Sequence, residues 1–69
     1  MNNLGLHLKE YRKTFGMTQR ELARKLKLTT VTLCNLENDK IKAGPKVMRA
    51  VAKYFKLDIV EVVKMNDRN

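Results

Sequence analysis

The 69 residues, of which 43% are hydrophobic, allow one small domain and exclude a large core. Lys and Arg number 15 against 7 Asp and Glu, so the net charge of +8 indicates a polyanionic partner, although basic chains also bind membranes and acidic proteins. The single cysteine excludes an intramolecular disulfide, and the chain has no Cys/His cluster for a structural metal, so neither a metal nor another cofactor is expected.

The sequence has no feature of a secreted, membrane-bound or catalytic protein. No signal-peptide pattern is present and no apolar run has the length of a membrane span, so we expect a cytoplasmic protein without a membrane partner. One His, one Cys and no Ser provide no nucleophile with a base and an orienting group, so we expect no catalytic residue and no enzyme. We expect no second domain to sense a ligand, and therefore no small-molecule ligand.

Two helices are predicted in the first third of the chain. Apolar residues recur at spacings of four, three and four from Leu4 to Phe15, which predicts a helix over about residues 3–14 that ends at Gly16. Thr18 and Glu21 have the spacing of a capping box, in which each side chain bonds to the backbone amide of the other residue. A second helix therefore begins at Thr18 and ends near residue 27.

A third helix follows directly, with Thr29 as its N-cap. Leu33 and Leu36 share its inward face, whereas its outward face carries small polar and β-branched residues instead of the usual Lys, Glu and Gln. Two short helices joined by a tight connection, over about residues 18–37, form the pattern of a helix-turn-helix. The unusual outward face indicates contact with something other than water.

Two more helices are predicted in the remaining chain. Gly44 and Pro45 mark the start of the fourth, because proline is suited to the first helical position. Asp58 and Glu61 can form a second capping box over residues 59–63, where the β-branched residues would also suit a strand; we favour a helix. The predicted fold class is therefore all-α with five helices, as one domain over residues 1–65 and a flexible tail over residues 66–69.

The helix-turn-helix segment resembles the lambda-repressor-like family, which includes the phage repressor and Cro type of DNA-binding domain. The matching residues in the segment are Gln19, Leu22, Ala23, Leu28, Thr29, Leu33, Leu36 and Glu37, and the resemblance extends to Arg12, Gly44, Pro45 and Asp58. Lys27 and Asp39 stand where the family usually has glycine, so we expect either a strain of about 1 kcal/mol at each or a slightly different turn.

The resemblance implies binding to double-stranded DNA, with helix 29–38 in the major groove. The resemblance implies base contacts by Thr30, Val31, Asn35 and the neighbouring Cys34. The side chains of Thr30, Val31 and Asn35 also carry hydrogen-bonding or methyl groups that can read base edges. The expected phosphate contacts are Gln19, Thr29, Asn38, Lys40, Lys42 and Lys46. Arg12 and Glu37 are expected to form a structural ion pair that fixes the recognition helix. If the protein does not bind DNA, the expected base-contact residues and the lysines would simply form a solvated surface.

The expected function is that of a sequence-specific transcriptional regulator, most simply a repressor that binds a palindromic operator as a homodimer. The final segment has more apolar surface than one short element needs, so the expected dimer contact consists of Ile59, Val60, Val62, Val63 and Met65. One alternative is a protein-interaction module, such as an antitoxin or accessory factor with the same scaffold. Another is a nonspecific architectural DNA-binding protein.

Overall fold

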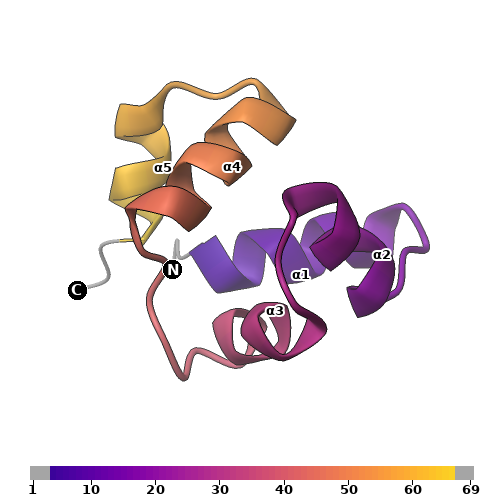
Figure 1. Cartoon of the computed structure of the whole chain (residues 1–69). Helices are drawn as coiled ribbons and strands as arrows, with labels where there is room; N and C mark the ends of the chain where they lie inside the picture. Colours follow the sequence, from indigo (N-terminus) through magenta and orange to yellow (C-terminus); the bar gives the residue numbers. More distant parts are fainter. Residues whose placement is uncertain (1–3, 67–69) are drawn as a thin grey trace.

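Five α-helices make up the computed structural model, which describes residues 4–66 (Figure 1). They are α1 (Leu4–Thr14), α2 (Gln19–Leu26), α3 (Thr30–Glu37), α4 (Pro45–Phe55) and α5 (Ile59–Asn66). The predicted all-α fold class is confirmed, and the final segment is a helix and not a strand. None of the helices between residues 4 and 66 is long and apolar enough to cross a membrane.

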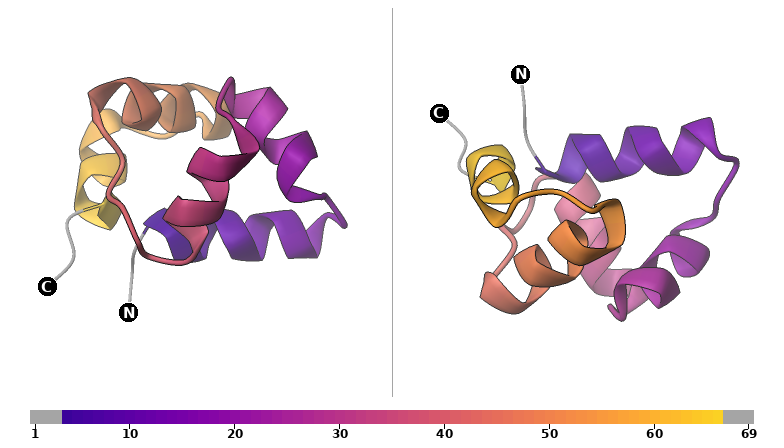
Figure 2. Two further views of the ribbon diagram at one scale, coloured as in Figure 1. Left: turned by 60° about the horizontal axis from the view of Figure 1, so that its bottom comes forward. Right: turned by 90° about the horizontal axis from the view of Figure 1, so that it is seen from above.

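The helices pack in a closed order around one core. Helix α1 contacts α3, α3 contacts α2, α2 contacts α4, α4 contacts α5, and α5 returns to α1. The two views of Figure 2 show α4 and α5 on one side of the molecule and the turn from α1 to α2 on the other. The buried apolar residues are Leu4, Leu8, Leu22, Ala23, Leu26, Leu33, Leu36, Ala43, Val51 and Val62. Every helix therefore contributes at least one buried residue to the same core.

Local capping contacts set the ends of the helices. The Thr18 hydroxyl accepts a hydrogen bond from the Glu21 amide at 3.1 Å, and the Glu21 carboxylate accepts one from the Thr18 amide at 2.8 Å, which confirms the first capping box. The bond from the Thr18 amide is the main reason why the pKa of Glu21 lies below its ordinary value. At α5 the box is absent in the expected form, because the Asp58 carboxylate accepts from the Val60 amide instead, at 3.1 Å.

Three of the turns between residues 4 and 66 use left-handed backbone at a residue other than glycine, and the last of these is at Lys56, with φ of 55°. Lys27 has φ of 59° and Asp39 has φ of 62°, at the two positions where the resemblance led us to expect glycine. The turns have therefore kept the glycine-type conformation despite the side chains, which costs about 1 kcal/mol at each position. In the first turn the Leu28 amide still donates to the Ala23 carbonyl at 2.8 Å, so the connection between α2 and α3 remains tight.

The C-terminal boundary differs from the prediction. Asn66 was expected to begin a flexible tail, but it is the last residue of α5 and its side chain bonds to the backbone of Ala43. The expectation was wrong at this residue because the bonding partner is 23 positions away in the sequence. The remainder of the predicted tail, residues 67–69, and the predicted helical residue 3 lie outside the described residues.

Gly5 lies where α1 crosses the end of α3. It is buried, and a Cβ atom at this position would overlap the carbonyl oxygen of Leu36 and lie 2.8 Å from its carbonyl carbon. Glycine weakens a helix interior by about 1 kcal/mol relative to alanine, so its presence here needs a compensating reason. The close approach of the two backbones supplies that reason.

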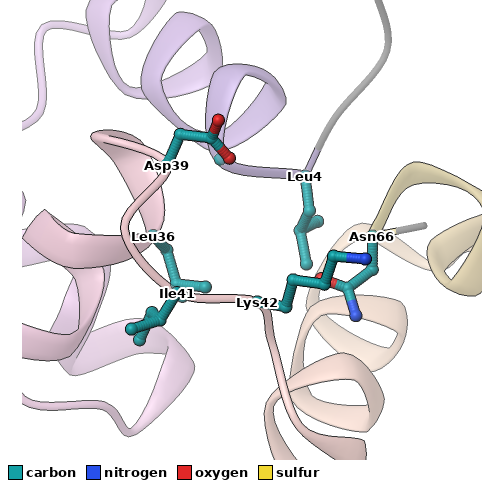
Figure 3. Close-up of a pocket in the computed structure, with 7 residues that line it drawn as sticks. Leu4, Leu36, Asp39, Ile41, Lys42 and Asn66 are labelled. Carbon is teal, nitrogen blue, oxygen red and sulfur yellow. The ribbon is translucent and has the colours of Figure 1, made fainter. Parts of the chain in front are cut away.

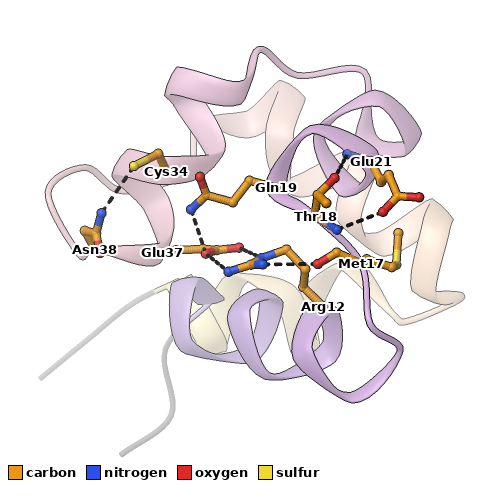
Figure 4. Close-up of polar contacts among 8 residues, drawn as sticks. All are labelled: Arg12, Met17, Thr18, Gln19, Glu21, Cys34, Glu37 and Asn38. Carbon is orange, nitrogen blue, oxygen red and sulfur yellow. Dashed lines mark hydrogen bonds and ion pairs between the residues drawn. The ribbon is translucent and has the colours of Figure 1, made fainter.

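A buried ion pair joins the same two helices. Arg12 of α1 donates from Nε to Oε2 of Glu37 at 2.9 Å and from Nη2 to Oε1 at 3.0 Å, and its Nη1 donates to the Met17 carbonyl at 3.1 Å (Figure 4). The Glu37 side chain is only 2% exposed, so this two-bond arrangement is what makes its charge tolerable. The structure thus contains the ion pair that the sequence led us to expect, and the pair fixes α3 against α1.

We predict that Gly5→Ala destabilises the protein by about 2 kcal/mol, because a loss of up to about 3 kcal/mol from overpacking exceeds a gain of about 1 kcal/mol in helix propensity. Urea-induced unfolding would measure the difference. Gly44→Ala is a suitable control, since a Cβ atom there meets nothing within 4 Å. Equal losses in the two variants would contradict the close approach of α1 and α3.

We also predict that Arg12→Ala and Glu37→Ala each cost about 3 kcal/mol, because each leaves a charged partner with little solvent. The double variant should lose clearly less than the sum of the two, which a double-mutant cycle measured by urea unfolding would show. Lys13→Ala, at an exposed neighbour on α1, should change stability by no more than about 0.5 kcal/mol. Additive losses would mean that the two side chains do not interact.

Candidate nucleic-acid interface

The outward face of α3 gathers the four residues that we expect to contact bases. Thr30, Val31, Cys34 and Asn35 occupy positions i, i+1, i+4 and i+5, which form one stripe along a helix. Thr30 and Val31 are exposed, with Val31 at 69%, while Cys34 and Asn35 are half-buried. The stripe therefore offers a hydroxyl, methyl groups, a thiol and a carboxamide at the helix surface.

This stripe carries no charge. The only ionisable group of α3 besides the thiol is Glu37, and its carboxylate points inward to Arg12. Short neutral side chains allow another backbone or a base edge to approach closely, and the methyl and amide groups match the features that bases present in a major groove. The geometry is thus suited to reading a groove, whereas attraction to an anion has to come from neighbouring elements.

Gln19 connects the ion pair to the start of α2. Its Nε2 donates to Oε1 of Glu37 at 3.1 Å, so Glu37 accepts hydrogen bonds from two helices (Figure 4). This contact was not foreseen from the sequence, which led us to expect only a phosphate contact. A carboxamide nitrogen has two N–H donors, and the second remains available at the helix N-terminus, where unpaired amides favour an anion.

Thr29 and Asn38, at the two ends of α3, already have partners within the helix. The Thr29 hydroxyl accepts from the Thr32 amide at 3.1 Å and donates to the Thr32 hydroxyl at 2.8 Å. The Asn38 Nδ2 donates to the Cys34 sulfur at 3.3 Å. A phosphate contact from Thr29 would require its hydroxyl proton to turn away from Thr32, whereas Asn38 retains a second N–H donor.

The three predicted phosphate-binding lysines line the connection from α3 to α4. Lys40 and Lys42 lie in the connecting loop and Lys46 in the first turn of α4, and all three side chains are exposed. Figure 1 shows the loop continuing from the end of α3 up to α4. Positive charge therefore lies on the segment that leaves the C-terminal end of α3, and charges of this kind contact phosphates without reading the sequence.

The apolar residues of α5 divide between two faces. Ile59, Val60 and Val63 are 42%, 54% and 44% exposed, which leaves them available as a contact surface. Val62 is 0% exposed, so its assignment to the dimer contact is wrong: the packing of α5 against α4 and α1 places this side chain in the core. Met65 is half-buried and packs against the same core. The exposed apolar surface of α5 is thus smaller than the sequence suggested.

Within residues 4–66, no group of three His, Cys, Asp or Glu side chains lies close enough together to hold a metal ion.

Comparison with known proteins agrees with this geometry. A family model described as helix-turn-helix, HTH_3, matches residues 8–62, which is well over half of the chain. The comparisons with curated proteins and with solved structures gave no match. The matched region contains α2, α3 and the ion pair between Arg12 and Glu37. The chain therefore belongs to the lambda-repressor-like helix-turn-helix family of DNA-binding domains.

Proposed function

We propose that this protein is a sequence-specific transcriptional repressor of the cytoplasm that binds a palindromic operator as a homodimer. The observation that carries the proposal is the neutral, methyl- and amide-bearing stripe of α3, flanked by exposed lysines. Membership of a DNA-binding family supports it. The proposal requires no catalytic residue, metal or small-molecule ligand.

The stripe supplies groups that distinguish base pairs in the major groove. The Asn35 carboxamide can accept from N6 and donate to N7 of adenine, and the methyl groups of Val31 can contact a thymine methyl. Thr30, at the first turn of α3, can donate to or accept from a base edge. The fixed position of α3 against α1 lets these groups bind without a loss of helix freedom on association.

Phosphate contacts would come from both sides of the stripe. Gln19 offers its second N–H at the start of α2, and Lys40 and Lys42 offer their ammonium groups from the loop before α4. These contacts attract and orient the duplex but do not distinguish sequences. Sequence-specific binding needs both kinds of contact: the neutral residues distinguish bases, and the charged residues position the duplex.

A homodimer and repression are supported by two surfaces. Two recognition helices about 34 Å apart would read successive turns of the same duplex face, and Ile59, Val60 and Val63 provide an apolar patch for the contact between copies. On α2 the exposed charges are mainly basic, and the one acidic side chain, Glu21, is engaged in the capping box. An acidic surface that would recruit another protein is therefore missing from α2, which favours repression by covering the DNA.

We predict that selection from a random duplex library at about 0.15 M salt enriches a palindrome with half-sites about one turn apart. Thr30→Ala combined with Asn35→Ala should remove the preference, because a bidentate amide contact alone is worth about 1–3 kcal/mol of discrimination. Lys40→Ala should instead weaken binding to all duplexes about equally. Direct binding measurements with enriched and scrambled duplexes would separate these effects.

Two results would redirect the interpretation. Tight binding only at low salt, with no enriched sequence, would indicate an architectural DNA-binding protein. Absence of DNA binding, together with a protein partner that the Thr30/Asn35 double variant still binds, would indicate a protein-interaction module.

We further predict that Val60→Glu makes the protein monomeric and weakens operator binding, because it places a charge in the proposed apolar contact. Sedimentation velocity would measure the oligomeric state. Val31→Glu is the matched control: it adds the same charge at an exposed valine of α3, so it should abolish DNA binding and leave the dimer intact. A wild-type dimer that Val60→Glu does not alter would rule out α5 as the contact.

A further inference from the structure

The last residue of α5 holds the loop between α3 and α4. The Asn66 Oδ1 accepts from the Ala43 amide at 2.9 Å, and its Nδ2 donates to the Ala43 carbonyl at 2.8 Å. One side-chain amide thus satisfies both backbone groups of one residue in another part of the chain. The same Nδ2 lies 3.5 Å from the Met48 sulfur, which adds a contact to α4.

Ala43 lies in the part of the loop between the last backbone hydrogen bond of α3 and the first backbone hydrogen bond of α4. The end of α3 closes with the Lys40 amide donating to the Asn35 carbonyl at 2.9 Å, and α4 opens with the Met48 amide donating to the Gly44 carbonyl at 2.9 Å. Between these two bonds, Ala43 is fixed by Asn66 and by its own side chain, which is 6% exposed. Because buried backbone groups require hydrogen-bond partners, loss of the Asn66 amide would leave the Ala43 N–H and carbonyl to bond with water.

The residues around Asn66 show that it holds the loop between α3 and α4 in place. A cavity of about 10 Å³, room for one water molecule at most, lies where the loop meets the start of α1 and the end of α5 (Figure 3). Asp39, Ile41 and Lys42 of the loop line it together with Asn66 (Figure 3). The loop therefore packs closely against the start of α1 and the end of α5 near the bonds from Asn66.

We propose that Asn66 is a positioning residue for DNA binding: its amide fixes the loop so that Lys40 and Lys42 are presented to phosphates in one arrangement. This inference rests on the proposed DNA-binding function and adds to it a residue of α5. Fixing the backbone of one residue costs about 1–2 kcal/mol of conformational entropy, so a loop that is already ordered binds with an advantage of roughly tenfold.

The first test needs no DNA. In Asn66→Ala, the Ala43 amide should exchange with solvent hydrogen at least about tenfold faster than in the wild type, while core amides such as that of Val51 keep their protection. NMR-detected hydrogen exchange measures both in the same sample. Unchanged exchange at Ala43 would overturn the anchoring role itself.

The second test measures DNA affinity against salt, with the duplex selected as above. Asn66→Ala should weaken binding about tenfold and reduce the slope of log affinity against log salt by about 1–2, since each lost phosphate contact removes about 0.9. In a Lys40→Ala/Lys42→Ala background, Asn66→Ala should cause no further loss. Thr14→Ala, at an exposed neutral residue of α1, is the control and should change neither affinity nor slope.

The outcomes separate the two proposals. If the wild type binds the duplex and Asn66→Ala binds it with the same affinity and slope, the positioning role is overturned and the proposed function stands. If the wild type binds no duplex, the proposed function fails, and the positioning role fails with it even where Ala43 exchange shows that the anchor exists.

Discussion

The carboxylate of Glu37 imposes the main constraint on this structure. A charge that is almost completely removed from solvent is stable only when hydrogen-bond donors surround it, and here the donors come from Arg12 on α1 and Gln19 on α2. Since Glu37 is the last residue of α3, one interaction fixes the recognition helix relative to both neighbouring helices. Under our proposal, the second N–H of the Gln19 amide contacts a phosphate, so that the scaffold and the DNA interface share this residue.

A close backbone contact between α1 and α3, at Gly5, imposes a second constraint. Helix α1 can approach the carbonyl of Leu36 only because Gly5 has no side chain, and the chain then leaves α3 through the left-handed residue Asp39 into the loop that Asn66 holds at Ala43. Position of the loop therefore depends on α1, α3 and α5 together. A helix far along the sequence from the recognition helix contributes to the surface beside it.

Charge is distributed according to what each group has to do. Under our proposal, the neutral stripe of short side chains on α3 approaches base edges, and the exposed lysines of the adjoining loop and of the first turn of α4 attract phosphates. This separation explains how a chain with a net charge of +8 can still discriminate between sequences under our proposal: nonspecific attraction and readout come from different residues.

The sequence by itself determined the five helices and most of their ends, because a cap such as Thr18 with Glu21 acts over only three residues and so is visible as a local pattern. The ion pair between Arg12 and Glu37 was also expected, through the family resemblance. Only the tertiary structure decided that Val62 faces the core and that Asn66 belongs to α5 and bonds to Ala43. The physical reason is that periodicity fixes which residues share a helix face, whereas burial and long-range hydrogen bonds depend on which other element meets that face.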